Sequence, residues 1–241
     1  MLKCLSMHIP ASSRLIVALD VPSANDALSL VDAIGDAADF YKVGLELFAA
    51  GDGHTLVEAL KKRGLRVFVD LKLFDVPETV ARATAQVAAL GADFLTVHGN
   101  DAIMQAAADA RSTQLKILAV TALTSLDSGD LRDLGFSCDV RELVLSRAQR
   151  ALKLGCDGVV SSGLEVAALR RTCGSDLVVV TPGVRPLTNR PPDDQKRVAT
   201  PTQIIRDGGD YLVVGRPIRD AANPRDAALA IQKEIAASLS A

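Results

Sequence analysis

Short apolar runs rich in β-branched residues alternate along this chain with Ala-rich stretches of helical periodicity. Eight such runs are expected to form strands, near residues 14–20, 39–43, 66–71, 93–97, 115–120, 157–160, 177–181 and 210–214. Helical patterns lie between and after them, at 25–34, 55–62, 77–90, 102–111, 140–154, 164–171, 201–206 and 224–239. This alternation indicates right-handed crossovers and a parallel sheet that is covered by helices.

Eight strands favour an α/β fold of the (β/α)8 TIM barrel type, in a single domain, over an open doubly wound sheet. The chain has 241 residues, close to the ~250 residues that such barrels typically take. No GxGxxG motif follows the first strand, so a dinucleotide-binding sheet loses most of its support. We expect residues 1–13 to be an N-terminal extension and residues 14–241 to be the barrel domain.

Composition narrows the possible partners and the location. The 27 basic and 29 acidic residues give a formal charge of −2, and no Lys/Arg run is present to follow a nucleic-acid backbone. No stretch is apolar over a membrane-spanning length, and the first residues lack the core of a signal peptide. The four cysteines form no CxxC pair. We therefore expect a cytoplasmic protein that binds neither nucleic acid nor membrane.

Charged residues stand where three neighbouring strands are expected to end. Asp20 follows the first apolar run, Lys42 lies in the second, and Asp70 and Lys72 end the third. Side chains two residues apart on a strand share a face, so Asp70 and Lys72 are expected on the same side. The carboxyl ends of parallel strands meet at one rim of a barrel, where barrels hold their catalytic groups. The sequence therefore predicts a shared polar site at this rim.

Structural roles are alternatives for each of these charged residues. Asp75 precedes Val-Pro-Glu, which resembles a capping box, so Asp75 is also a candidate N-cap of the helix at 77–90. Asp20 precedes a Val-Pro turn, and Lys42 is also compatible with a solvated strand end. His98 ends the fourth strand, where hydrogen-bonded packing is favoured over catalysis.

The end of the eighth strand suggests a phosphate site. Gly215 lets a ligand approach the backbone, and Arg216 offers a guanidinium fork at the place where barrels commonly bind phosphate. The alternative is that Arg216 covers the last helix at the surface. The proline-rich segment 182–200 is expected to be a mobile loop over the site, and segment 121–135 is a second candidate of this kind.

These segments together resemble the orotidine 5'-phosphate decarboxylase family. The resemblance rests on residues 17–20, 42–44, 70–79, 181–185 and 214–216, and runs from the first strand to the last. The DxKxxD spacing at 70–75 alone is shared with magnesium-dependent sugar-phosphate lyases of the same superfamily. In those relatives the position that resembles Lys42 typically holds a metal-binding carboxylate, so a lysine there argues against a cation.

The resemblance implies a homodimeric enzyme that decarboxylates orotidine 5'-monophosphate to uridine 5'-monophosphate in de novo pyrimidine biosynthesis, without metal or cofactor. It implies that Lys72 protonates C6 of the pyrimidine, with Asp70 beside the substrate carboxylate. The other implied positions are Asp75 and Thr79 from the partner subunit, Asp20 and Lys42 at the ribose, Thr124 over the pyrimidine, and Arg185, Gln195, Gly215 and Arg216 at the phosphate. Lys42 is also implied to be part of the catalytic charged network. Two alternatives stay open, a magnesium-dependent sugar-phosphate lyase and a non-catalytic nucleotide-binding barrel.

Overall fold

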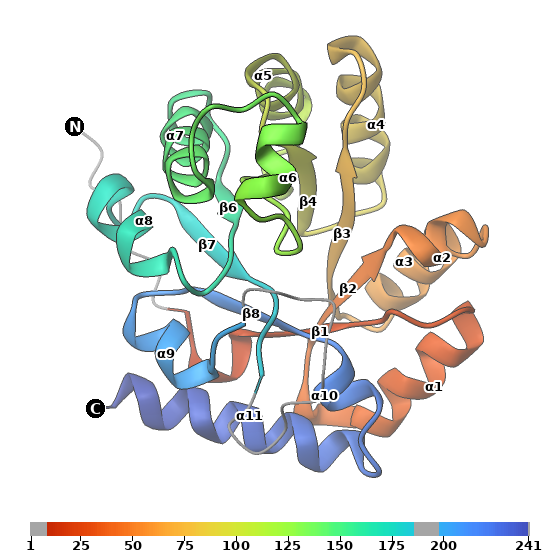
Figure 1. Ribbon diagram of the computed structural model, residues 1–241. Coiled ribbons are helices and arrows are strands. Elements are labelled where there is room, and N and C mark those ends of the chain that lie inside the picture. The colour runs from red at the N-terminus through yellow and green to blue at the C-terminus, as the bar shows by residue number, and fades with distance from the viewer. Residues whose placement is uncertain (1–8, 186–197, 241) are drawn as a thin grey trace.

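A closed barrel of eight parallel strands forms the centre of the computed structural model, which describes residues 9–185 and 198–240 (Figure 1). The strands are β1 (Leu15–Ala18), β2 (Phe40–Gly44), β3 (Arg66–Leu73), β4 (Phe94–His98), β5 (Lys116–Val120), β6 (Gly158–Val160), β7 (Val178–Thr181) and β8 (Tyr211–Val214). Each strand pairs with its neighbours in sequence, and β8 pairs with β1. The predicted eight-stranded barrel is therefore confirmed.

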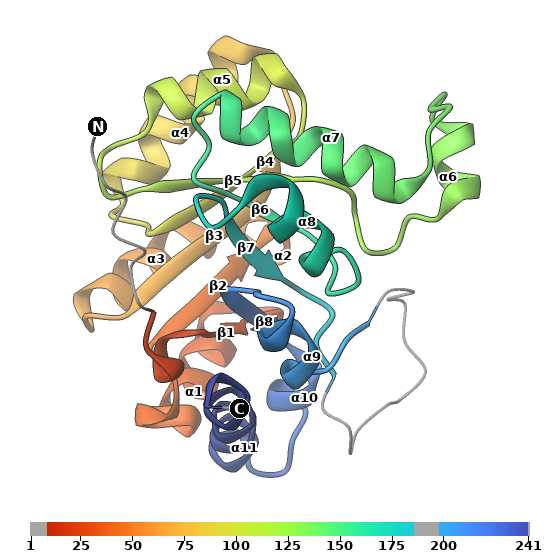
Figure 2. The ribbon, with the colours of Figure 1, turned by 90° about the vertical axis from the view of Figure 1, so that its left-hand side faces the viewer.

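Helices surround the strands as an outer layer (Figures 1 and 2). The eight predicted helices are present as α1 (Ala24–Ile34), α3 (Gly53–Lys62), α4 (Pro77–Ala89), α5 (Asp101–Ala110), α7 (Val140–Lys153), α8 (Val166–Cys173), α9 (Pro201–Arg206) and α11 (Pro224–Leu239). Side-chain caps begin several of them: the Ser23 hydroxyl accepts a hydrogen bond from Asp26 N, and Asp139 forms a capping box with Glu142. No helix among the described residues is both long and apolar enough to cross a membrane.

Three short α-helices of the described residues were not predicted. These are α2 (Leu45–Ala49), α6 (Ser128–Asp133) and α10 (Arg216–Arg219). Helix α6 occupies part of segment 121–135, the second candidate for a loop over the site, so this segment is not a loop throughout. The Asp127 carboxylate accepts hydrogen bonds from Gly129 N and Asp130 N, while Asp130 accepts one from Asp127 N. A helix of six residues is too short to show a hydrophobic period, so only this capping box marks it in the sequence.

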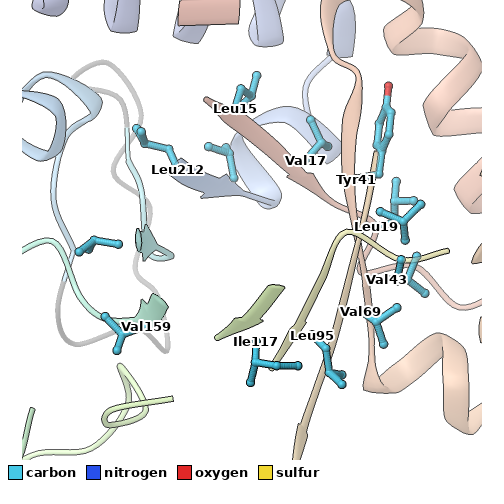
Figure 3. Close-up of a cluster of buried hydrophobic side chains, with 14 of the residues drawn as sticks. Leu15, Val17, Leu19, Tyr41, Val43, Val69, Leu95, Ile117, Val159 and Leu212 are labelled. Carbon is cyan, nitrogen blue, oxygen red and sulfur yellow. The ribbon is translucent and has the colours of Figure 1, made fainter. Parts of the chain in front are cut away.

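The alternating side chains of the strands divide the apolar core into two layers. Side chains on the outer face of the strands, such as Val17, Val69 and Leu95, pack against the surrounding helices (Figure 3). Side chains on the inner face fill the barrel, and the largest of them are the aromatic rings of Phe40, Phe68, Phe94 and Tyr211. The Phe94 ring centroid lies 5.0 Å from that of Phe40 and 5.2 Å from that of Tyr211, in edge-to-face contacts.

Three of the four inner aromatic side chains occupy one half of the barrel, because Phe40, Phe94 and Tyr211 stand at the first positions of their strands. The carboxyl half is therefore left to the polar residues at the strand ends. The loop after β5 and helix α6 lie at this same end of the barrel (Figure 2). The two described parts of segment 182–200 also meet, since Arg185 N donates to Ala199 O over 3.0 Å.

The chain before β1 packs against the opposite end of the barrel. Ile9 contacts the inner apolar cluster, and Arg14 Nε donates to Ile9 O over 3.2 Å. A 3-10 turn at Ala11–Ser13 leads into β1. The boundary between an N-terminal extension and the barrel at residue 14 stays a prediction.

Candidate active site

A cavity of about 550 Å³ opens at the carboxyl ends of the strands. Eight of the predicted site residues line it, namely Asp20, Lys42, Asp70, Lys72, Thr124, Arg185, Gly215 and Arg216. Its floor is apolar, because the inward-facing side chains of Phe68, Val120, Val160 and Val213 close it from below. The structure thus brings the charged strand ends and three of the phosphate-site candidates, Arg185, Gly215 and Arg216, to one concave site of the size that small ligands occupy.

Four charged side chains form a row of alternating sign across the first three strands. Lys42 Nζ lies 2.9 Å from Asp20 Oδ1 and 3.5 Å from Asp70 Oδ2. On the other side of Asp70, Lys72 Nζ lies 2.9 Å from Asp70 Oδ1. The strand register produces this row, since Ala18 of β1 pairs with Lys42 and Gly44 of β2 pairs with Asp70. Each of the two inner charges therefore has an opposite charge on either side.

The inner pair, Lys42 and Asp70, is nearly removed from water. Their side chains are 11% and 12% exposed, whereas those of Asp20 and Lys72 are 46% and 40% exposed. Burial works against the charge on Asp70, but the cations of Lys42 and Lys72 outweigh it and hold the pKa of Asp70 below its ordinary value. Burial likewise opposes the charge on Lys42, but Asp70 and Asp20 raise its pKa above the ordinary value. Both inner groups are therefore ionised at neutral pH.

The backbone at Lys72 departs from a regular strand. Lys72 has φ +48°, and it is the only non-glycine residue with positive φ in the described part of the chain. The pairing of β3 with β4 shifts register between Val69 and Leu73, and Lys72 N donates to the Thr96 hydroxyl over 2.9 Å. Such conformations are costly and occur mainly at functional sites. Asp70 and Lys72 share a side, as predicted, but the strand between them is irregular.

Asp75 and Thr79 lie apart from the main cavity in this single chain. They line a second, smaller pocket together with Phe74 and Lys72. The N-cap of α4 is Val76, and no side chain caps this helix. The capping alternative for Asp75 is therefore wrong, because its carboxylate accepts a hydrogen bond from Val76 N (2.6 Å), outside the first turn.

His98 has a packing role, as expected from the sequence. Its ring centroid lies 4.6 Å from that of Phe74. His98 Nδ1 lies 2.9 Å from Asn100 Oδ1.

The end of β8 supplies two arginines to the cavity, of which the sequence predicted one. Arg216 begins α10 and lines the cavity. Arg219, one turn later, also lines it and was missed. Arg219 donates to the backbone oxygen of Asp20 over 2.8 Å and binds the Asp220 carboxylate with two nitrogens. Two arginines three residues apart share one face of a helix, and this spacing could have pointed to Arg219. Helix α10 was too short to be predicted, so the spacing was not used.

The remaining phosphate-binding candidates lie in segment 182–200. Arg185 lines the cavity and is 6% exposed, and its Nη1 donates to Val184 O over 2.9 Å. Gln195 lies outside the described residues.

Comparison with known proteins identifies the family. A model described as "Orotidine 5'-phosphate decarboxylase / HUMPS family" matches residues 13–231. The chain belongs to this family. A protein of Methylococcus capsulatus named orotidine 5'-phosphate decarboxylase is 63% identical over 94% of this chain and 93% of its own length. One of the same name from Nitrobacter winogradskyi is 50% identical over 95% of both chains.

A solved structure agrees with the family membership. The crystal structure of orotidine 5'-phosphate decarboxylase from Lactobacillus acidophilus is similar to this chain with a TM-score of 0.82 and 36% identity, over 92% of this chain and 99% of that one. The two chains agree in fold over nearly their whole lengths.

Replacing the buried cation tests the charge row. Lys42→Met should lower the free energy of unfolding at neutral pH by about 3 kcal/mol, because Asp70 would stay buried with only one cation beside it. Losing Lys42 also raises the pKa of Asp70, so the carboxyl group takes up a proton more readily in the variant. The difference from wild type should therefore shrink as the pH falls toward about 4.

Urea unfolding at several pH values measures this difference. The control is Lys62→Met, because the Lys62 side chain is 80% exposed and its ion pair with Glu58 is a surface one. This control should lose less than about 1 kcal/mol. A Lys42→Met protein as stable as the control would show that the buried row contributes no stability.

Proposed function

We propose that this chain decarboxylates orotidine 5'-monophosphate to uridine 5'-monophosphate and carbon dioxide in de novo pyrimidine biosynthesis, without a metal or cofactor. The observation that carries the proposal is the Asp20–Lys42–Asp70–Lys72 row at the barrel mouth. It occurs in a chain 63% identical to a protein with that name. The row offers a fixed ammonium beside a fixed carboxylate, which is what this reaction needs.

Lys72 is the proposed proton donor. When the bond from C6 to the substrate carboxyl group breaks, its electron pair stays on C6 in the plane of the ring, where the ring system cannot delocalise it. The Lys72 ammonium stabilises this charge and then transfers a proton to C6, and the resulting amine takes a proton from solvent. Its contact with Asp70 at 2.9 Å supports this role, because a preorganised charge stabilises the carbanion without reorganising water.

Asp70 is the proposed neighbour of the substrate carboxylate. Its side chain is nearly buried. It is nevertheless ionised, because Lys42 and Lys72 hold its pKa low against the effect of burial. Two carboxylates brought together in a site of low polarity repel each other, and the departure of carbon dioxide relieves this repulsion. Asp70 thereby favours the transition state over the bound substrate, in addition to orienting Lys72.

The remaining cavity residues are proposed to bind the nucleotide away from the reacting carbon. Asp20 and Lys42 contact the ribose hydroxyls, and Thr124 lies over the pyrimidine from the loop after β5. The phosphate contacts proposed are Arg185, Gly215, Arg216 and, in the segment outside the described residues, Gln195. A cavity of about 550 Å³ with arginines on one side supports this division. The binding energy of the phosphate then offsets the cost of orienting and desolvating the substrate at C6.

A homodimer with shared sites is the proposed assembly. Asp75 and Thr79 lie outside the main cavity but on a pocket that Lys72 also lines. Large apolar side chains are exposed on either side of Asp75, since Phe74 and Val76 are 66% and 61% exposed, and Leu45 at the main cavity is 67% exposed. Apolar surface of this kind supports contact with a second copy. We propose that Asp75 and Thr79 complete the site of the partner subunit.

A cytoplasmic location is proposed together with this activity. Cys138, Cys156 and Cys173 are free thiols. Burial raises the pKa of Cys156 to about 12, which makes this thiol unreactive. Unpaired thiols support a reducing compartment.

Replacing the proposed proton donor tests the reaction. Wild-type protein treated with a metal chelator should remove the ultraviolet absorbance of the orotate ring from orotidine 5'-monophosphate. Lys72→Ala should lower turnover by about 10³-fold or more while the protein keeps its fold, because both charge stabilisation and proton transfer are lost. Lys62→Ala, at an exposed lysine, is the control and should keep full turnover.

Three results would contradict the proposal. Near wild-type turnover of Lys72→Ala would remove Lys72 from its role. A wild-type enzyme inactivated by the chelator would favour the magnesium-dependent sugar-phosphate lyase. A wild-type protein that binds uridine 5'-monophosphate but leaves the substrate unchanged would favour a non-catalytic barrel.

Mixing two inactive variants tests the shared site. Asp70→Asn and Asp75→Asn should each be inactive alone, since every site lacks one carboxylate. After subunit exchange, about half of the dimers should be hybrids with one intact site of two, giving about a quarter of wild-type turnover. Turnover is followed by the same absorbance assay. Absence of recovery, with exchange verified by native mass spectrometry, would show that Asp75 does not serve the partner's site.

A further inference from the structure

Thr96 is a buried hydroxyl that touches both members of the Asp70–Lys72 pair. It lies in the middle of β4, is 0% exposed, and is not among the residues that line the main cavity. Its Oγ1 accepts a hydrogen bond from Lys72 N over 2.9 Å and donates one to Asp70 Oδ1 over 2.8 Å. Thr96 therefore contacts the proposed catalytic groups without being placed to contact substrate.

The direction of both hydrogen bonds is fixed by the chemistry of the groups. A backbone N–H only donates, and an ionised carboxylate only accepts. The single proton of the Thr96 hydroxyl therefore points to Asp70, and a lone pair of its oxygen faces Lys72 N. Asp70 Oδ1 also accepts from Lys72 Nζ over 2.9 Å. The backbone and the ammonium of Lys72 are thus tied to the same carboxylate oxygen, one through Thr96 and one directly.

The Thr96 hydroxyl replaces a bond that the sheet does not make. In the regular part of the pairing, Val69 of β3 lies opposite Leu95 of β4, and the register then shifts before Leu73. Lys72 lies inside this shift with φ +48°, a conformation that a lysine adopts only when its surroundings enforce it. Without the hydroxyl, the Lys72 N–H loses its partner and the backbone is free to return to an extended conformation, which moves the ammonium.

We propose that Thr96 is a positioning residue that holds the strained backbone of Lys72 and the carboxylate of Asp70 in the geometry that decarboxylation requires. This inference rests on the proposed function. It assigns to Thr96 an effect on the chemical step, since the transition state depends on where the Lys72 ammonium lies. Binding of the nucleotide through its ribose and phosphate depends on other residues and is independent of Thr96.

Three substitutions of Thr96 separate the hydroxyl from the packing. Thr96→Ala and Thr96→Ser both lack the methyl group and differ only in the hydroxyl. Thr96→Val keeps the volume of threonine without the hydroxyl. It replaces Thr96→Ala in the comparison if the alanine variant does not fold. The matched control is Thr84→Ala on α4, because Thr84 is 0% exposed and its hydroxyl has no hydrogen-bond partner in the part of the chain that the structure describes.

The measurements are kcat and KM for orotidine 5'-monophosphate, and the Kd of uridine 5'-monophosphate, for each variant beside wild type. Thr96→Ala and Thr96→Val should lower kcat by about 10- to 100-fold, the effect of one lost hydrogen-bonding group at a charged site. The Kd should stay within about threefold of wild type. Thr96→Ser should keep kcat within about threefold, and so should Thr84→Ala.

Any other outcome contradicts either the positioning role of Thr96 or the proposed function. An active wild type with Thr96→Ser as slow as Thr96→Ala shows that the methyl group matters and the hydroxyl does not. Thr96→Ala or Thr96→Val with unchanged kcat, or with a loss confined to KM and Kd, also removes the positioning role. A wild-type protein that leaves the substrate unchanged overturns the proposed function itself. This outcome is distinguishable from a failure of the Thr96 role, because it appears in the wild-type protein before any variant is compared.

Discussion

The site depends on one buried ion pair, between Lys42 and Asp70. Moving two charges out of water costs several kcal/mol for each, and a single pair regains this only with very good geometry. Here each member has a second opposite charge, Asp20 for Lys42 and Lys72 for Asp70, at the partly exposed ends of the row. The inner pair therefore stays ionised at the barrel mouth, where a ligand meets charges that are already in place.

The barrel makes this arrangement possible by separating apolar from polar positions along each strand. The aromatic side chains at the strand beginnings fill one half of the barrel, and Phe68 and Val213 carry the apolar surface up to the floor of the cavity. These apolar side chains exclude water from the barrel interior beneath the charge row. Parallel pairing brings the ends of β1, β2 and β3, which carry the charges, together over this apolar layer. The same strand register thus determines both the core and the site.

The regular part of this structure could be predicted from the sequence, because it follows from periodicity and strand direction. The eight strands and the grouping of Asp20, Lys42, Asp70 and Lys72 are of this kind. Thr96 could not be predicted, since a threonine in a strand resembles any other β-branched residue there. The positive φ of Lys72 depends on pairing with β4, which is not a local property. Asp75 matched a capping pattern, but α4 begins after Val76 instead.

The position of the Lys72 ammonium relative to a bound pyrimidine tests the central claim most directly. A crystal structure of the protein with uridine 5'-monophosphate should place Lys72 Nζ roughly 3 Å from C6, within reach for proton transfer, while Nζ still contacts Asp70. A complex in which the nucleotide fills the cavity but Lys72 Nζ points into bulk solvent, or has left Asp70, would contradict the account.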